Sequence, residues 1–297
     1  MKKHVQPLTP NPLASGCQAK KMTLNSYLKA FAARNPAPLA QTPRANLWRV
    51  DTEDGPAVLK VLTERGLKVG DMIGTDLLGL WGGEGAVRPI AQAKDALLME
   101  WLQGPSLKDT TPYGRDELAV EVIAETALKL RRPATEGFID LKDHFGGVLT
   151  KAEPSSFPEP YGNAFSRAKF LWHELLKTTQ ESCLMHGDLN YDNILWSERG
   201  WCAIDPKGII GDPCYEFSVV FRNPIGEEER AAKPERMLTL AEGFATRAGL
   251  DKTRILQFGF AHVAMSLAYH FDRTGRLSET DLAIFLAFDR LGLAGSP

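Results

Sequence analysis

Two aspartates and two asparagines lie within six positions of one another in the segment CLMHGDLNYDNILW, residues 183–196. They are Asp188, Asn190, Asp192 and Asn193. Polar side chains grouped this closely are solvated, bound to a metal ion, or engaged in catalysis. The surrounding residues decide among these three alternatives.

A calcium-binding loop is the first alternative, because Asp188, Asn190 and Asp192 match the first three ligand positions of an EF-hand. That loop then requires glycine at its sixth position and glutamate at its twelfth. Here these positions hold Asn193 and Arg199. The spacing therefore excludes an EF-hand.

A polar turn would be the better prediction for DLNYDN alone, because Asp and Asn often bond their own backbone in turns. The following residues favour a different interpretation. NILW predicts a strand, SERG a turn, and WCAI a second strand that ends at Asp205. Asn193 and Asp205 would then meet at the same end of one hairpin. An amide and a carboxylate side by side can hold Mg2+, which takes few protein oxygens and leaves its other positions to substrate phosphates.

The spacing between Asp188 and Asn193 points to the same chemistry. Asp188 precedes Asn193 by five residues, as the aspartate precedes the asparagine in the catalytic loop of protein kinases. In that loop the aspartate accepts the proton of the attacking hydroxyl and the asparagine binds Mg2+. The segment therefore indicates phosphoryl transfer.

The elements that would position these residues divide the chain into two parts. The first third favours strands, with turn residues between short β-favouring runs. Its predicted elements are a short helix within 26–36, strands at 47–50 and 57–62, a helix at 72–81 ended by two glycines, and strands at 86–90 and 96–102. Gly104-Pro105 ends this pattern.

The remainder has apolar residues at helical spacing. Helices are predicted within 115–132, 165–179, 237–249 and 256–271. We therefore predict an α+β protein with a β-rich lobe at 1–103, including an extension to about residue 40, and a helical lobe at 104–297. A small β lobe joined to a larger helical lobe suits a ligand site between the two.

Composition excludes several classes of function. The 35 basic and 37 acidic side chains nearly cancel, so no broad basic surface is available for nucleic acid or an anionic membrane. The four cysteines show no CxxC spacing and fit reduced thiols rather than a zinc site. No apolar run is long enough for a membrane span, and the basic start lacks the apolar region of a signal peptide. We expect a cytoplasmic protein, and the sequence predicts no oligomeric state.

His186-Gly187-Asp188 with Asn193, followed by Ile204-Asp205, resembles the active site of the aminoglycoside phosphotransferases, which share the protein-kinase-like fold. AIDPKG (203–208), GDP (211–213) and FRNP (221–224) are similar to the streptomycin 6-phosphotransferase and hydroxyurea-resistance kinase branch. Further likeness at 57–61, 80–90 and 96–107 extends the resemblance over most of residues 45–275.

This resemblance implies an enzyme that transfers the γ-phosphoryl group of ATP, or another nucleoside triphosphate, with Mg2+ to an alcohol group of a small molecule. The implied substrate is a streptomycin-like aminoglycoside or hydroxyurea, and the implied activity is antibiotic inactivation. Asp188 is the expected catalytic base, and Asn193 and Asp205 the expected metal ligands. His186 would brace the loop, while Asn190 and Asp192 have loop roles.

The nucleotide would be held by the first lobe. Lys60 lies in AVLKVL, which matches the kinase pattern V-A-I-K and would pair with a phosphate. Glu100, Trp101 and Leu102 would form the hinge that holds adenine. Kinases usually supply a glutamate to the lysine from the next helix, but Gly74 occupies that position here. Asp76 is the expected shorter substitute, and Asp71 is another. The turn at 42–48, which would cover the phosphates, contains no glycine.

The remaining polar residues have open or structural interpretations. Lys207 either contacts phosphate or substrate, or pairs with a nearby carboxylate. Asp212 is expected to brace the catalytic loop, and His262 and His270 to lie in a helical core. An acidic recess for a polycationic substrate could use Glu227, Glu228, Glu229 and Asp272, although a run of charges is usually a solvated face.

Two other functions remain as alternatives. One is a metabolic kinase that acts on a sugar or amino alcohol. The other is a nucleotide-binding protein without activity, consistent with the missing helix glutamate and the glycine-free turn. The presence of Lys60, Asp188, Asn193 and Asp205 together argues against an inactive protein.

Overall fold

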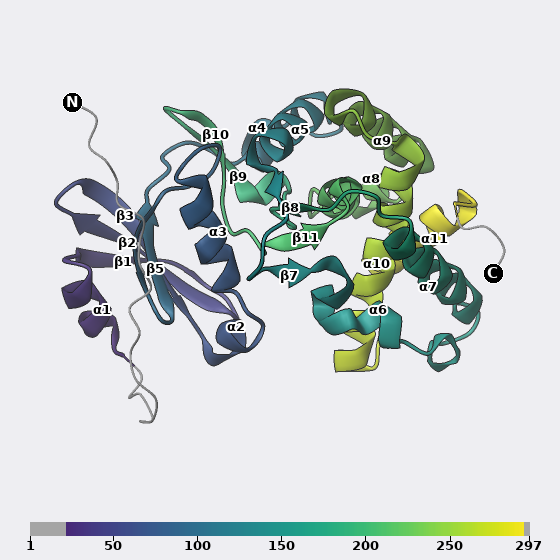
Figure 1. Ribbon diagram of the computed structural model, residues 1–297, viewed down its shortest axis with the longest axis horizontal. Helices are drawn as coiled ribbons and strands as arrows, with labels where there is room; N and C mark the ends of the chain where they lie inside the picture. The colour runs from purple at the N-terminus through teal and green to yellow at the C-terminus, as the bar shows by residue number, and fades with distance from the viewer. Residues whose placement is uncertain (1–21, 294–297) are drawn as a thin grey trace.

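The structure, a computed structural model, describes residues 22–293. The basic start of the chain and Cys17 lie outside this range. A small β-rich part is followed by a larger, mainly helical part, which is the predicted α+β organisation (Figure 1).

The β-rich part is one antiparallel sheet of five strands in the order β1-β2-β3-β5-β4. Its strands are β1 (Arg34–Gln41), β2 (Ala45–Thr52), β3 (Gly55–Leu62), β4 (Pro89–Ala93) and β5 (Ala96–Glu100). The helices of this part are α1 (Leu24–Ala30), α2 (Glu64–Lys68) and α3 (Ile73–Trp81).

Side chains alternate along β3, so the sheet presents two different faces. Ala57 and Leu59 are fully buried on the face that α1 covers, where they pack with Tyr27. Val58 packs instead with the larger core that includes α3, and the same alternation places Lys60 on that face. Figure 1 shows α1 and α3 on opposite sides of the sheet. Helix α3 therefore lies on the side of the sheet that carries Lys60.

Strands β2 and β3 form the predicted hairpin, and α3 ends as predicted at Gly82, which has a left-handed φ of 57°. Strand β1 was not predicted. All its residues are exposed and it contains two prolines, so it has neither an alternating pattern nor β propensity. The strand predicted at 86–90 runs instead from Pro89 to Ala93.

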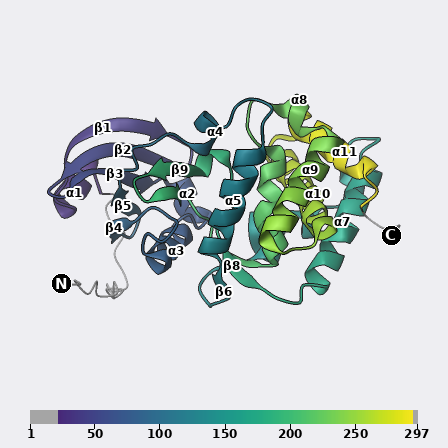
Figure 2. The same ribbon diagram turned by 90° about the horizontal axis from the view of Figure 1, so that it is seen from above.

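The helical part contains eight described α-helices. They are α4 (Leu107–Thr110), α5 (Glu117–Leu130), α6 (Val148–Lys151), α7 (Gly162–Lys177), α8 (Glu228–Ala231), α9 (Pro234–Ala248), α10 (Lys252–Thr274) and α11 (Glu279–Arg290). The long, apolar α10 lies at the centre and packs against α7, α9 and α11 (Figure 2). None of the helices in residues 22–293 has both the length and the apolar character needed to cross a membrane.

Short strands underlie the segment that the sequence analysis singled out. A four-stranded sheet has the order β6-β8-β11-β7, made of β6 (Arg132–Pro133), β7 (Ile139–Asp140), β8 (Cys183–Met185) and β11 (Ile209–Gly211). The predicted hairpin consists of β9 (Ile194–Ser197) and β10 (Gly200–Ala203). These strands bracket the candidate catalytic residues.

The β9–β10 hairpin bonds to the segment that follows β5 and to the segment that precedes β4. Trp196 N donates to Pro105 O at 2.9 Å, and Gly104 N donates to Trp196 O at 3.1 Å. Val87 N donates to Ala203 O at 2.9 Å. A Cβ on Gly104 would lie 2.5 Å from Trp196 O, so only glycine permits this close approach. The hairpin thereby joins the segment after β5 to the loop that bears Asp205.

Candidate active site

A buried carboxylate, that of Glu216, holds the backbone of the loop after β8. Glu216 accepts hydrogen bonds from His186 N at 2.7 Å and from Gly187 N at 2.9 Å. Gly187 has φ 78°, and a Cβ there would lie 2.5 Å from the side chain of Ile209. The glycine of the His-Gly-Asp motif is thus required both by its backbone conformation and by the space available.

His186 braces this loop, as predicted. Its Nδ1 accepts from Asp188 N at 3.2 Å, so the ring proton lies on Nε2, which donates to Ile204 O at 2.9 Å. The ring stacks on Trp81 with centroids 6.0 Å apart. Burial lowers the pKa of His186 to about 4, which keeps the ring neutral. His186 therefore orients the backbone of Asp188, and both of its ring nitrogens are occupied by backbone contacts.

The side chain of Asn193 bonds to the backbone of Asp188. Asn193 Nδ2 donates to Asp188 O at 2.8 Å, and no hydrogen bond to Asn193 Oδ1 is made within the described residues. Asn190 Nδ2 donates to Asp188 Oδ1 at 3.1 Å and its Oδ1 accepts from Asp192 N at 3.0 Å. Burial raises the pKa of Asp188, although the charge of Lys207 partly offsets this effect. One carboxylate oxygen of Asp188 is thus oriented by an amide of the same loop.

Asp205 lies at the end of β10 beside Asn193, where the hairpin prediction placed it. Ile204 N donates to Asn193 O at 2.9 Å, and Asp205 has the unusual φ of 56°. Its two carboxylate oxygens pair with two lysines, Lys60 on one oxygen and Lys207, at 2.8 Å, on the other. Burial alone would raise the pKa of Asp205, but the charges of Lys207 and Lys60 outweigh it and hold that pKa far below its ordinary value.

Lys60 comes from β3 and reaches Asp205 across 145 positions of sequence. Asp76 does not pair with it. Asp76 is exposed and accepts a hydrogen bond from Gln92 at 3.2 Å, and no ion pair joins it to Lys60 in the described structure. Asp71 pairs with Arg44 at 3.3 Å. Neither of the expected substitutes for the helix glutamate therefore reaches the lysine.

Gly74 shows why the helix supplies no partner. A Cβ on Gly74 would lie 1.9 Å from the carbonyl oxygen of Pro206. Helix α3 therefore packs directly against the loop that follows Asp205, and any side chain at position 74 would displace that loop. Lys60 pairs with Asp205 of the same loop instead.

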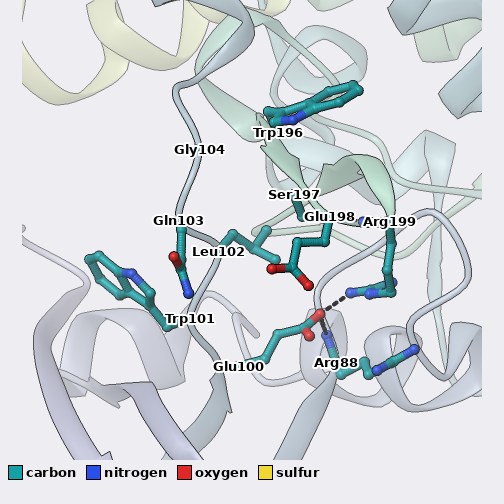
Figure 3. Close-up of a pocket in the computed structure, with 10 residues that line it drawn as sticks. All are labelled: Arg88, Glu100, Trp101, Leu102, Gln103, Gly104, Trp196, Ser197, Glu198 and Arg199. Atoms are coloured by element: carbon teal, nitrogen blue, oxygen red, sulfur yellow. Dashed lines mark hydrogen bonds and ion pairs between the residues drawn. The ribbon is translucent and has the colours of Figure 1, made fainter.

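The predicted hinge residues line a cavity of about 510 Å³. Its walls are Glu100–Gly104 and Arg88 on one side and Trp196–Arg199 on the other (Figure 3). The Glu100 carboxylate accepts from Arg88 N at 2.9 Å and pairs with Arg199. Lys60, Asp188, Asn193 and Asp205 do not line this cavity. The side chain of Glu100 therefore links the predicted hinge to the turn of the β9–β10 hairpin.

Trp101 has a different environment from Glu100. The guanidinium of Arg49 lies 5.8 Å from the centroid of the Trp101 ring, a cation–π contact between β2 and the hinge. Leu102 is buried in the larger core. The three hinge residues thus have distinct surroundings, and their side chains do not converge on one point.

The residues beside Asp188 fit a magnesium ion. Asp205 supplies a carboxylate and Asn193 an amide oxygen that accepts no other bond in the described structure, and Mg2+ prefers such oxygen ligands. Within residues 22–293, no group of three or more His, Cys, Asp or Glu side chains could hold a metal ion. A metal at this position would therefore need oxygens from a phosphate ligand, as Mg2+ in nucleotide sites does.

Other predicted residues have structural partners. Asp212 accepts from Cys214 N at 3.0 Å and pairs with Arg254 at 2.7 Å, so it braces the turn after β11. His262 is buried and its Nδ1 lies 2.9 Å from Tyr215 Oη, whereas His270 is exposed. The acidic candidates for a substrate recess have different surroundings. Glu227 pairs with Arg230 at 2.5 Å, whereas Glu229 and Asp272 are exposed.

Sequence reasoning missed two carboxylates that hold the site together. Glu216 lies below the loop, and Asp116 accepts hydrogen bonds from Tyr191 Oη at 2.5 Å, Arg230 at 2.5 Å and Arg236 at 2.8 Å. Burial alone would raise the pKa of Asp116, but the two arginines outweigh it and lower the pKa to about 2. Nothing local marks either residue, because their partners lie 29 or more positions away.

Comparison with known proteins finds relatives with related activities. Residues 31–275 match the family described as aminoglycoside/hydroxyurea antibiotic resistance kinase. Streptomycin 3''-kinase of Klebsiella pneumoniae is 31% identical over 225 residues, which cover 73% of this chain and 80% of that protein. Hydroxyurea phosphotransferase of Kitasatospora aureofaciens is 26% identical over 291 residues, which cover 91% of this chain and 78% of that protein.

Solved structures share the fold at lower sequence identity. A thermostable mutant of aminoglycoside phosphotransferase APH(4)-Ia, in a ternary complex with ADP and hygromycin B, has a TM-score of 0.61 at 13% identity and matches 90% of this chain and 95% of its own. Choline kinase LicA from Streptococcus pneumoniae has a TM-score of 0.60 at 11% identity, with 91% and 97% matched. The fold is therefore protein-kinase-like, and the chain belongs to the aminoglycoside/hydroxyurea antibiotic resistance kinase family.

Proposed function

We propose that this protein transfers the γ-phosphoryl group of ATP to a hydroxyl group of a small molecule, with a streptomycin-like aminoglycoside or hydroxyurea as the substrate. One observation supports this most strongly. Lys60 from the sheet and Asp188, Asn193 and Asp205 from the helical part converge at one point, although Lys60 lies more than 120 positions before the others. An inactive nucleotide-binding protein would not need the base.

Asp188 is the proposed catalytic base. The substrate oxygen forms its bond to the γ-phosphorus as the bond from that phosphorus to the β-phosphate oxygen breaks, and the hydroxyl proton passes to Asp188. Because phosphoryl transfer has a loose transition state, catalysis depends mainly on position and charge. The bond from Asn190 Nδ2 to Asp188 Oδ1 orients the carboxylate, and Asp188 Oδ2 is directed towards Lys207.

Asn193 and Asp205 are the residues that would hold Mg2+, which when bound would neutralise charge on the nucleotide phosphates. Lys60 is the proposed phosphate contact from the sheet. The backbone of Glu100, Trp101 and Leu102 is the proposed hinge for adenine, between a nucleotide lobe ending at residue 103 and a helical lobe beginning at residue 104. The use of ATP and the free thiols of Cys183, Cys202 and Cys214 favour the cytoplasm.

The test is a product assay. The protein is incubated with Mg-ATP and, separately, streptomycin, hydroxyurea and a set of polyols and amino alcohols, and products are examined by mass spectrometry. We expect one phosphoryl group on streptomycin or hydroxyurea, and 31P NMR of the product identifies the hydroxyl. Replacing Asp188 by Asn should lower kcat by about 100-fold or more while retaining ATP binding.

The other outcomes separate the alternatives. Product from a polyol or amino alcohol alone would indicate a metabolic kinase. A melting temperature raised by Mg-ATP without any product would indicate a nucleotide-binding protein. Unchanged turnover in the Asp188→Asn variant would show that Asp188 is not the base.

A further inference from the structure

Lys207 lies between the two carboxylates that the proposed reaction uses. Its ammonium nitrogen is 2.8 Å from Asp205 Oδ2, 3.3 Å from the Asp205 carbonyl oxygen and 3.4 Å from Asp188 Oδ2. Only 14% of its side chain is exposed, compared with 27% for Asp188 and 37% for Asp205. The most buried member of the charged cluster is thus a lysine with no assigned function.

The backbone of Lys207 is bonded to the catalytic loop, and the contacts of its side chain with Asp205 and Asp188 are made by the terminal ammonium. Lys207 N donates to His186 O at 2.8 Å, which ties it to the catalytic loop. Gly208 follows with φ 68°, and a Cβ there would lie 2.9 Å from the ring of Phe138. A lysine ammonium is carried by a flexible four-carbon stem with rotatable donors. Lys207 can therefore redirect its charge without any movement of the loop.

The contacts of Asp205 create a competition for its oxygens. Lys60 occupies Oδ1 and Lys207 occupies Oδ2. Mg2+ binds carboxylate oxygens at about 2.0–2.1 Å and requires near-octahedral geometry. An ammonium held 2.8 Å from Asp205 Oδ2 and a divalent cation bound to the same carboxylate would repel each other. A metal ion on Asp205 therefore competes with the two lysines for this carboxylate, and its binding is favoured when one of them withdraws.

We propose that Lys207 is the lysine that withdraws, and that it is a further functional residue of this site. Before ligand binds, the Lys207 ammonium supplies the positive charge beside Asp205 that a metal ion would later supply. The charges of Lys60 and Lys207 then equal those of Asp188 and Asp205. When it leaves Asp205, it remains beside Asp188 and pairs with the phosphoryl group in transfer. Lys60, by contrast, reaches the cluster from the sheet and stays with the phosphates. This inference rests on the proposed phosphotransferase function.

The test measures binding of Mn2+, a paramagnetic substitute for Mg2+, by the electron paramagnetic resonance signal of the free ion. Wild-type protein is compared with the variants Lys207→Met and Lys207→Arg, with and without ADP. Lys108→Met is the matched control, since Lys108 also pairs with a carboxylate of the catalytic loop, Asp192 at 3.7 Å, but is more exposed.

Without nucleotide, we expect Lys207→Met to bind Mn2+ about fivefold or more tightly than wild type, because the variant site carries an unbalanced negative charge and lacks the competing ammonium. Lys207→Arg and Lys108→Met should bind Mn2+ as wild type does. With Mg-ATP and substrate, Lys207→Met should lower kcat by about tenfold or more and change the KM for ATP much less. Lys207→Arg should recover part of this kcat.

The outcomes distinguish this proposal from the proposed function. Equal Mn2+ affinity in Lys207→Met and wild type would overturn the role of Lys207, and Lys207→Gln gives the same comparison if the methionine variant does not fold. A wild-type protein that binds no Mn2+ even with ADP would instead contradict the proposed metal site. If Lys207 had only a structural role, Lys207→Met would lower the melting temperature and leave the Mn2+ affinity unchanged, which would also overturn the proposal.

Discussion

At the residue scale, burial changes the protonation of several groups around the catalytic loop. The pKa values of His186 and His144 are lowered to about 4, and that of His262 lies well below the ordinary value, in each case mainly because burial disfavours the imidazolium. Burial acts in the opposite sense on carboxyl groups, raising the pKa of Glu216 to about 7 and also that of Asp188. Acidification therefore affects the folded and unfolded chains differently.

We expect the free energy of unfolding to fall by about 1–2 kcal/mol between pH 7 and pH 5.5. Below about pH 6.5 the unfolded chain protonates the three histidines, while the folded protein keeps them neutral, so stability present above that pH is lost. Glu216, with its pKa raised to about 7, takes up a proton in the folded state over this range and opposes the effect, and the raised pKa of Asp188 acts in the same sense, but the three histidines outweigh them. Urea unfolding at the two pH values measures the difference. His262→Gln should reduce it, and a free energy that rises on acidification would contradict this account.

At the element scale, the contact between α3 and the loop after Asp205 decides how Lys60 is paired. Helix α3 approaches so closely at Gly74 that the helix cannot carry a side chain there, and its Asp76 faces solvent beside Gln92. The same contact holds Pro206, the residue between Asp205 and Lys207. The position of the helix thus controls the geometry of the charged cluster without supplying any charge to it.

Replacing Gly74 by Ala should destabilise the protein by about 1–3 kcal/mol and lower kcat/KM, because the added methyl group forces the loop away from α3. Gly79→Ala is the matched control in the same helix, since a Cβ at Gly79 meets nothing within 4 Å. This control should stabilise the protein by up to about 1 kcal/mol, because alanine favours the helix. Urea unfolding and steady-state kinetics measure both. Similar behaviour of the two variants would show that the contact at Gly74 is unimportant.

At the scale of the whole molecule, Asp116 connects the catalytic loop to helices α8 and α9. It accepts from Tyr191, three residues after Asp188, and pairs with Arg230 of α8 and Arg236 of α9. Arg236 also donates to Asn223 O at 2.7 Å. Three regions of the sequence, around residues 116, 191 and 230–236, therefore meet at one carboxylate, and the loop position depends on how the helices pack.

Asp116→Asn should lower the free energy of unfolding by about 3–5 kcal/mol, because it leaves the buried Arg236 without its counter-charge and Arg230 with Glu227 as its remaining carboxylate partner. Its effect on kcat should exceed that on KM for ATP, since Tyr191 lies in the catalytic loop. The neighbouring substitution Glu117→Gln is the control, because Glu117 and its partner Arg115 are both about 70% exposed and should contribute under about 0.5 kcal/mol. A comparable loss in both variants, measured by urea unfolding, would contradict the proposed role of Asp116.

Local patterns in the sequence determined several parts of this protein. The five-residue spacing from Asp188 to Asn193, the β9–β10 hairpin that brings Asn193 to Asp205, and the helical periods of α5, α7, α9 and α10 all involve residues close in sequence. Such features follow from turn chemistry and side-chain periodicity, which a short segment contains by itself. The exposed strand β1 has neither signal, and it was missed for that reason.

Only the tertiary structure decided which charges meet. Lys60 pairs with Asp205, Gly74 packs on Pro206, and Asp116 pairs with Arg236, in each case across more than 110 positions of sequence. The sequence also left the role of Lys207 open for this reason. Lys207 shares Asp205 with Lys60, and Lys60 belongs to the distant strand β3. Each of these contacts requires two elements to pack at a particular distance and angle, and no pattern within either segment specifies that packing.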